Sequence, residues 1–258
     1  MKFDDAGYTL TPVDCGRLDV DWDNLTLKRH KGATLRVACI LWVVQGRGHT
    51  VVVDSGPGDP ATVTSLTGRE LIQDEPPQET LKRLGVDAAA VEILVLSHLH
   101  WDHAGGLDLF PNAAIYVHRR ELHFAIAPVP IQMRPYEWEA RDGRLPRWLA
   151  HRRRMRVIER DFAVAPGLEI VHLPGHTPGC IGLCCATPGG RHLIACDAAP
   201  TYENLRDGVP PGWYTDLEEA YASLAKMREI ADVILPGHDP DVLRAKRYPL
   251  PAGGDGFA

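Results

Sequence analysis

The segment SHLHWDHAGG, residues 97–106, places three histidines and one aspartate within six consecutive positions. His98 and His100 follow the apolar run VEILVLS, which is typical of a buried strand. At a strand end, residues i and i+2 point to the same side, so these two imidazoles can converge on one ion. Asp102 and His103 follow as the chain turns and can face a second ion. Imidazole nitrogens and carboxylate oxygens suit zinc, iron, cobalt or manganese.

Three other segments supply further candidate ligands. LPGHTPG contains His176, LIACDA contains Asp197, and ILPGHD contains His238. Each follows an apolar stretch that predicts a strand, and α/β proteins build their sites at strand ends. Chance explains one such element easily but the full set of five histidines and two aspartates poorly. The sequence therefore predicts a metal site.

Apolar runs bounded by turn residues predict the elements that position these ligands. Residues 35–44 and 50–54 flank the turn QGRGH and predict a β-hairpin. The clearest helix is 215–230, for which Thr215 and Glu218 form a candidate capping box. Shorter helices are expected at 76–85 and 119–126, and further strands at 91–97, 113–118, 162–175, 180–187, 191–197 and 232–238.

Two of these strands share a short pattern. GHTVVVD (48–54) and RHLIACD (191–197) each place a histidine five residues before an aspartate, across an apolar run. This similarity is consistent with two related α/β halves.

The bulk composition is that of an ordinary globular chain. It has 258 residues, 45% hydrophobic and 24% charged, and a net charge of −6 that gives no reason to expect a nucleic-acid partner. No apolar run is long enough to span a membrane, and the N-terminus lacks the apolar region of a secretory signal, so we expect a cytoplasmic protein. The six cysteines show no CxxC pairing, which favours reduced thiols over a disulfide framework.

We expect a single domain spanning 1–258, with a lid or insertion around 120–156. Arginines crowd the segment 141–160. The default interpretation of such a run is a solvated helix face, and the alternative is a lid that attracts anionic substrates.

The order of motifs VVVDSG, HLHWDH, PGHTPG, CDA and PGHD resembles the metallo-β-lactamase superfamily over most of the chain. The resemblance implies an α/β protein folded as an αββα sandwich, with mixed sheets, helices on the outer faces and a metal site at one sheet edge. It also implies a role for each motif residue: His98, His100 and His176 would hold a first ion, Asp102, His103 and His238 a second, Asp197 would bridge both, and Asp54 would orient ligands by hydrogen bonds.

Within that superfamily the sequence is most similar to the N-acyl-homoserine lactone lactonases, which implies a role in quorum quenching. The likeness lies in DHAGG, VIERDFAVAPGLEIVHLPGHTPG and DAAPTYENLRDGVP. Those lactonases usually place a substrate-contacting tyrosine three residues after the bridging aspartate, where this chain has Pro200. Tyr202 is the candidate replacement, with an ordinary surface residue as the alternative. The dipeptide Gly179-Cys180 also stands where these lactonases more often have Gly-His.

The resemblance implies a dinuclear hydrolase with two divalent ions, zinc being expected and iron, cobalt or manganese the alternatives. A hydroxide shared by two metals would attack an ester-like carbonyl of a small molecule, most simply a lactone, and Asp102 could shuttle the proton. We expect no nucleic-acid or membrane partner. The sequence is compatible with either a monomer or a homodimer.

Several rival functions fit the same ligands. A glyoxalase II-type thioesterase and a phosphodiesterase are the main alternatives. β-Lactams are less favoured as substrates, because the second ion would have no cysteine ligand, unlike that of the best-known β-lactamases of the superfamily. A di-iron oxidoreductase of the flavodiiron type favours glutamate at the position of His100 and needs a flavin domain for which this chain has no room. A metal-binding protein without catalysis is the remaining alternative.

Overall fold

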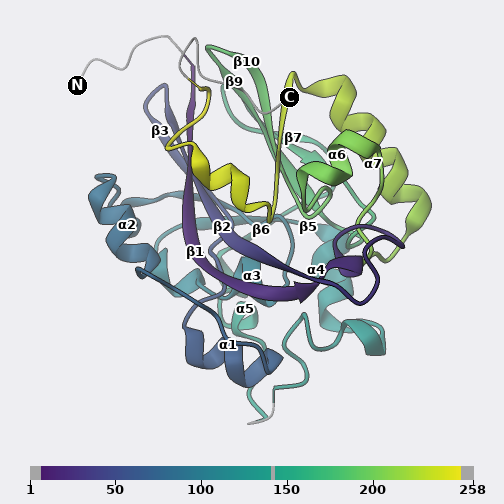
Figure 1. The fold of residues 1–258 in the computed structure, drawn as a ribbon. Coiled ribbons are helices and arrows are strands. Elements are labelled where there is room, and N and C mark those ends of the chain that lie inside the picture. The colour runs from purple at the N-terminus through teal and green to yellow at the C-terminus, as the bar shows by residue number, and fades with distance from the viewer. Residues whose placement is uncertain (1–6, 141–142, 251–258) are drawn as a thin grey trace.

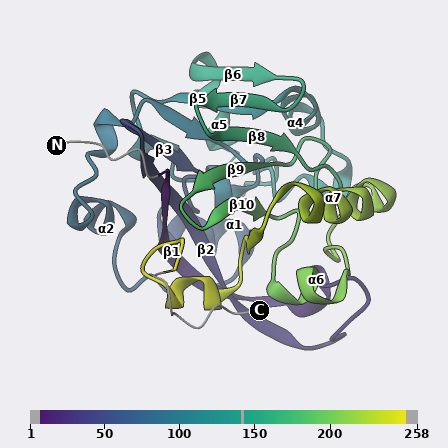
Figure 2. The same ribbon diagram turned by 90° about the horizontal axis from the view of Figure 1, so that it is seen from above.

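The structure is a computed structural model that describes residues 7–140 and 143–250. Two β-sheets pack against each other, and helices cover their outer faces (Figures 1 and 2). The first sheet has the strand order β1-β2-β3-β4-β5-β6. Its strands are β1 (Thr9–Asp21), β2 (Thr34–Gly46), β3 (His49–Val53), β4 (Ile93–Val95), β5 (Ala114–His118) and β6 (Met155–Ile158).

The second sheet has the order β11-β10-β9-β8-β7. Its strands are β7 (Phe162–Ala165), β8 (Leu168–His172), β9 (Ile181–Thr187), β10 (Gly190–Cys196) and β11 (Val233–Pro236). Both sheets are mixed: β3 and β4 run parallel in the first, as do β10 and β11 in the second, beside antiparallel neighbours. The predicted hairpin over 35–54 is confirmed as β2 and β3.

The helices lie on the two outer sides of the sheets. Their bounds are α1 (Pro60–Thr67), α2 (Pro77–Arg83), α3 (Trp101–Ala104), α4 (Arg119–Ile126), α5 (Arg147–Ala150), α6 (Tyr202–Asp207) and α7 (Leu217–Ile230). Buried side chains of α1 to α5 pack in one apolar cluster with the outer face of the first sheet. Leu224 and Met227 of α7 pack against the outer face of the second sheet.

The period-2 alternation of strand side chains explains why both sheet faces are buried. In β3, Val51 and Val53 belong to the cluster between the sheets, whereas Val52 belongs to the cluster under the helices. In β10, Ile194 faces the other sheet and Leu193 faces α7. Strands that are apolar on both faces need cover on both sides. The αββα sandwich expected from the sequence is confirmed.

The predicted capping box at the start of the last helix is wrong. The helix begins at Leu217, and its N-cap is Asp216, whose Oδ1 accepts from the backbone N–H of Glu219 at 2.9 Å. The Thr215 hydroxyl instead donates to the carbonyl of Gly175 at 3.1 Å. A carboxylate at the next position has displaced the threonine as the cap.

The arginine-rich segment does not form one solvated helix face. It comprises α5, the short 3-10 turn η5 (Arg152–Arg154) and β6. Arg147 donates to the Pro57 carbonyl at 2.8 Å, and Arg154 donates to the Ala113 carbonyl at 2.8 Å. These two guanidinium groups therefore tie the segment to neighbouring loops.

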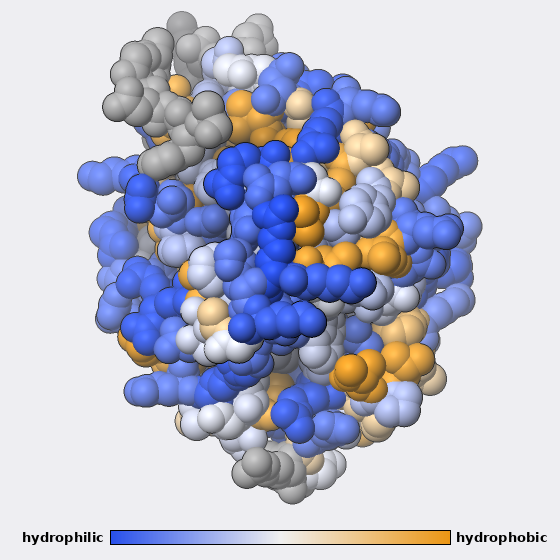
Figure 3. Space-filling view, turned by 45° about the vertical axis from the view of Figure 1, so that its right-hand side comes forward, coloured by the Kyte–Doolittle hydropathy of each residue, from blue (hydrophilic) through white to orange (hydrophobic). Residues whose placement is uncertain are grey.

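All six cysteines are free, in agreement with the expectation of reduced thiols, and all six are buried. Among the described residues, no helix combines the length and apolarity needed to cross a bilayer. The face shown in Figure 3 is mainly hydrophilic, with hydrophobic residues confined to limited areas.

Candidate metal centre

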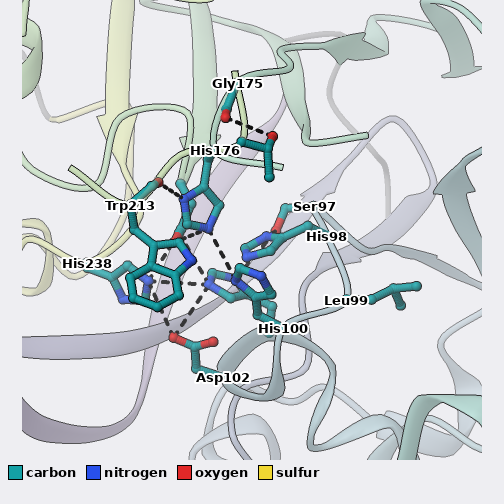
Figure 4. Close-up of polar contacts among 12 residues, drawn as sticks. Ser97, His98, Leu99, His100, Asp102, Gly175, His176, Trp213 and His238 are labelled. Atoms are coloured by element: carbon teal, nitrogen blue, oxygen red, sulfur yellow. Dashed lines mark hydrogen bonds and ion pairs between the residues drawn. The ribbon is translucent and has the colours of Figure 1, made fainter. Parts of the chain in front are cut away.

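The predicted ligands come from strand ends and loops that meet at one edge of the two sheets. The segment after β4 carries two histidines, α3 carries an aspartate and a histidine, and the β8–β9 loop, the end of β10 and the end of β11 carry one ligand each. Figure 4 shows the side chains of five of them converging: His98, His100, Asp102, His176 and His238. The structure brings together all seven: His98, His100, Asp102, His103, His176, Asp197 and His238.

These residues form overlapping groups in which the ligand atoms all lie within 4.8 Å of one another. One group is His98, His100 and His176. A second is Asp102, His103 and His238, and a third joins His98 and His103 through Asp197. The chain therefore offers two neighbouring ligand sets with one carboxylate between them.

Backbone carbonyls orient two of the histidines. Nδ1 of His176 lies 2.8 Å from the carbonyl oxygen of Trp213, and Nδ1 of His238 lies 2.8 Å from that of Ala38. A carbonyl only accepts, so each Nδ1 carries the proton and donates it. The Nε2 of each ring is then left with a lone pair that faces the cluster.

Asp54 and Ser97 orient two more histidines. The Ser97 hydroxyl donates to Asp54 Oδ2 at 2.8 Å, and its oxygen lies 3.0 Å from Nδ1 of His98. Since the single hydroxyl proton goes to Asp54, His98 must donate from Nδ1. His103 Nδ1 lies 2.8 Å from Asp54 Oδ2 and donates to it. Both rings therefore present a free Nε2 inward, the arrangement that metal-binding histidines usually have.

Two of these inward nitrogens lie close together although both rings donate from Nδ1: Nε2 of His103 is 3.3 Å from Nε2 of His238. Nε2 of His176 lies 3.2 Å from Nδ1 of His100. The buried Nε2 of His98 has no hydrogen-bond partner among the described residues. Lone pairs that face one another in a buried site repel, and a cation between them removes the repulsion. The residues present fit a metal pair.

Asp197 faces both ligand sets. Its Oδ1 lies 3.2 Å from Nε2 of His103 and 3.1 Å from Nε2 of His238, while its Oδ2 lies 3.4 Å from Nε2 of His176. Burial raises the pKa of this carboxyl, but His238, His103 and His176 more than offset that effect and hold the pKa well below its usual value. The side chain is therefore ionised near neutral pH.

The histidines of the two sets differ electrostatically. Burial lowers the pKa of His98 and His100 well below the usual value, so both rings are neutral ligands. Burial also lowers the pKa of His103 and His238, but Asp197 and Asp102, with Asp54 in the case of His103, together outweigh it and raise both.

Asp102 is the most exposed member of the cluster, with 19% of its side chain accessible. Its Oδ2 lies 3.8 Å from Nε2 of His103 and 3.7 Å from Nε2 of His238. It lines a cavity of about 160 Å³ that opens onto the ligands. The walls of this cavity are largely apolar and include Leu18, Val20, Leu25, Val37, Trp101, Pro135, Pro200 and Trp213.

The structure does not bring Tyr202 to this cavity. Tyr202 is the first residue of α6, and its ring packs in the cluster between the sheets. It lines a separate cavity together with Tyr248 and His192. Pro200 lies at the ligand cavity instead. The helix that begins at Tyr202 directs its side chain away from the ligand cavity, so the structure gives no support to Tyr202 as a substrate-contacting residue.

Sequence reasoning missed several residues that shape the site. Ser97 directly precedes the histidine motif, and its position at a strand end was a usable signal. The carbonyls of Ala38 and Trp213 carry no side-chain signal at all. Gln132 accepts from Nε1 of Trp213 at 3.0 Å, and this contact joins the predicted insertion to the loop that orients His176.

A comparison with known families decides the relationship. The metallo-beta-lactamase superfamily profile matches residues 37–238, which include every candidate ligand. The chain belongs to the metallo-beta-lactamase superfamily. The resemblance that the motifs suggested is confirmed, and with it the expectation of a metal-dependent hydrolase.

Several members of this superfamily that resemble the chain are lactonases. The N-acyl homoserine lactonase of Bacillus thuringiensis is 26% identical, with 88% of this chain and 91% of the relative aligned. The N-acyl homoserine lactonase AttM of Azorhizobium caulinodans is 28% identical, covering 89% and 92%. An N-acyl homoserine lactone hydrolase solved with N-hexanoyl-L-homoserine at its metal centre superimposes with a TM-score of 0.73 at 26% identity, covering 90% of this chain and 94% of that one.

Proposed function

We propose that this protein is a dinuclear metal-dependent hydrolase that opens a lactone ring, with N-acyl-homoserine lactones as the first candidate substrates. His98, His100 and His176 would hold one ion, and Asp102, His103 and His238 the other. The observation that carries the proposal is the position of Asp197, which directs one carboxylate oxygen to each set. The names and bound product of the similar lactonases support the substrate class.

When bound, two divalent ions supply Lewis acidity and lower the pKa of water toward neutrality. Zinc is the metal we propose, because histidine nitrogens and carboxylate oxygens are among its usual ligands. Asp54 and the carbonyls of Ala38 and Trp213 hold the ligand rings in the required tautomers. These groups orient the site without touching the substrate.

Asp102 is the residue we assign to proton transfer. Its Oδ2 faces the second ligand set. Its Oδ1 is then left to accept a proton from the attacking water and to pass it to the leaving alkoxide. Its side chain is open to the cavity, so a substrate in the cavity can reach it.

The cavity wall favours an uncharged acyl substrate over a phosphodiester. Its apolar members surround the ligands on the side where a substrate enters. Within the described part of the chain, no lysine or arginine lines this cavity. The charge of a phosphodiester would be balanced there by the proposed metal ions alone, without a side-chain cation, whereas an uncharged acyl chain suits the apolar wall.

We infer that the chain is one domain and that residues 120–156 are an insertion that shapes the cavity. The cluster between the sheets draws residues from both sheets, as expected of a common core. Pro135, within the insertion, lines the cavity, and its carbonyl accepts from the backbone N–H of Trp101 at 2.9 Å.

We also propose a cytoplasmic location. Six free cysteines are consistent with a reducing compartment, where thiols persist without pairing.

The test is metal analysis followed by a substrate screen. Protein purified without added metal should contain close to two transition-metal ions per chain. The loaded protein should then be assayed against short- and long-chain acyl-homoserine lactones, simple γ- and δ-lactones, a glutathione thioester and an aryl phosphodiester. Full activity without metal, or strong thioester turnover with no lactone opening, would contradict the proposal.

A further inference from the structure

Glu121, in the first turn of α4, is a carboxylate buried beneath the metal centre. Its Oε1 accepts the backbone N–H of Leu99 at 2.9 Å and the hydroxyl of Tyr136 at 2.7 Å. Leu99 is the residue between His98 and His100, and its side chain lies apart from the converging rings in Figure 4. Glu121 therefore holds the backbone of the two-histidine loop from behind.

A second route leads from Glu121 to the same loop. The Tyr136 ring, whose hydroxyl is bonded to Glu121, contacts the His100 ring edge-on, with centroids 4.7 Å apart and an interplanar angle of 72°. The carboxylate thus sets both the backbone beside His100 and the aromatic surface against its ring.

The loop that carries the third ligand of this set also meets Glu121. A Cβ on Gly179 would lie 2.1 Å from the backbone nitrogen of Glu121, so only glycine fits there. Burial raises the pKa of Glu121, and interactions with Thr177, Leu99, Tyr136 and Gly179 oppose that rise. Thr177 directly follows the ligand His176.

Among the described residues, no ion pair compensates for the burial of this carboxylate. Within residues 7–140 and 143–250, no lysine or arginine forms a salt bridge with Glu121. Glu121 also belongs to none of the candidate ligand groups found in the described part of the chain. A buried carboxylate is expensive unless hydrogen bonds compensate for lost water. Here Oε1 accepts from the ligand-bearing loop and from the insertion, while Oε2 has no hydrogen-bond partner among the described residues.

We propose that Glu121 is a positioning residue that fixes the geometry of the ligand set His98, His100 and His176 by tying two ligand loops to the insertion. The inference rests on the proposed function, since it concerns the same ligands. A metal set needs its donors held within about 0.5 Å of the productive geometry, and a shared buried acceptor provides that constraint.

Metal affinity of the Glu121→Ala protein is the direct test. We expect one of the two ions to bind about tenfold more weakly, the lower end of the effect of losing a group that orients ligands. Zinc titration against a chromophoric chelator measures each affinity. Glu121→Gln should restore most of the affinity, because the amide oxygen can still accept both hydrogen bonds.

A spectroscopic readout and a milder variant make the test independent of activity. Cobalt(II) bound to Glu121→Ala should show a changed visible absorption for one of its two ions. Tyr136→Phe keeps the ring on His100 and removes only the hydroxyl, so we expect a loss of about threefold in affinity for the same ion. This variant keeps the proposal testable if Glu121→Ala does not fold.

The matched control is Glu137→Ala. Glu137 is another buried carboxylate of the insertion, but its hydrogen bonds go to Arg147. We expect this variant to lose stability while both ion affinities stay at the wild-type value.

Equal weakening in the Glu137 and Glu121 variants, or wild-type affinities in Glu121→Ala, would overturn the inference while leaving the proposed function intact. A wild-type protein that binds no metal would overturn both.

Discussion

Two aspartates occupy equivalent places in the two sheets but face different partners. Asp54 follows β3 beside the parallel strand β4, and Asp197 follows β10 beside the parallel strand β11. The backbone is left-handed at both turns, with φ of 60° at Asp54 and 46° at Cys196, just before Asp197. Such strain at non-glycine residues is typical of functional turns.

Neighbouring backbone donors explain the difference between the two aspartates. After β4, the backbone N–H of Ser97 donates to Asp54 Oδ1 at 2.7 Å. After β11, the corresponding N–H of His238 donates to the carbonyl of Pro200 at 2.8 Å instead. Asp54 therefore accepts three hydrogen bonds, from the Ser97 backbone, the Ser97 hydroxyl and His103, and orients candidate ligands, whereas Asp197 directs its oxygens to the cluster. Similar turns can therefore place one aspartate to orient ligands and the other to face the ligand cluster, depending on where the backbone N–H of the neighbouring strand points.

The largest effect is expected from Asp197→Ala, which removes the carboxylate between the ligand sets. We expect loss of at least one ion and a fall in kcat of about 1000-fold, since several kcal/mol of transition-state stabilisation depend on the pair. Metal content and lactone turnover measure the two losses. A variant that retains two ions and ordinary turnover would remove the distinction between the aspartates.

Asp54→Ala tests the other side of the comparison. We expect two ions at saturating metal, with affinity lowered about 10- to 100-fold, because His103 loses the acceptor that fixes its tautomer. Chelator competition measures the affinity. If stoichiometry fell as in Asp197→Ala, Asp54 would be as directly involved as Asp197.

Ser97→Ala sharpens the comparison by removing only the hydroxyl between Asp54 and His98. The backbone N–H at position 97 still donates to Asp54. The loss of one hydrogen bond of about 1 kcal/mol corresponds to a roughly fivefold lower affinity for one of the ions. The same titration applies, and an effect as large as that of Asp54→Ala would show that the hydroxyl, not the carboxylate, dominates.

The smallest effect concerns a histidine pair that joins the two sheets away from the metal ligands. The rings of His118 and His172 stack with centroids 3.9 Å apart. Burial, and then His172, lower the pKa of His118 to about 4. Because the pKa of His118 is lower in the folded protein than in the unfolded chain, the neutral His118 ring stabilises the folded state. This contribution to the free energy of unfolding is complete above about pH 6.5 and is lost as the pH falls toward 4.

Urea unfolding of the metal-free protein at pH 7.5 and pH 5 measures the contribution of His118 to the free energy of unfolding. After discounting for solvent screening, we expect the free energy of unfolding to fall by about 1 kcal/mol more in the wild type than in His118→Phe between these two pH values. An equal loss in both proteins would assign the acid sensitivity to other groups.

Sequence reasoning succeeded where local pattern and chemistry coincide. The motif HLHWDH and the three isolated ligands lie at ends of apolar runs, so their convergence followed from strand geometry. The long strand β1 was missed, because its mixed sequence TLTPVDCGRLDVD lacks a strong apolar run. Thr215 failed as a cap because the neighbouring Asp216 competes for the same N–H groups, which a spacing rule does not resolve.

The sequence by itself determined the types of the candidate ligands, their positions near strand ends and the superfamily, because these depend on short-range periodicity and residue chemistry. Tertiary structure decided which partner each ligand meets. It directed Tyr202 into another cavity, placed Glu121 behind the histidine loop and gave Asp54 and Asp197 different donors. The physical reason is that hydrogen bonds between residues far apart in the chain depend on how the two sheets pack, and sequence spacing does not encode that packing directly.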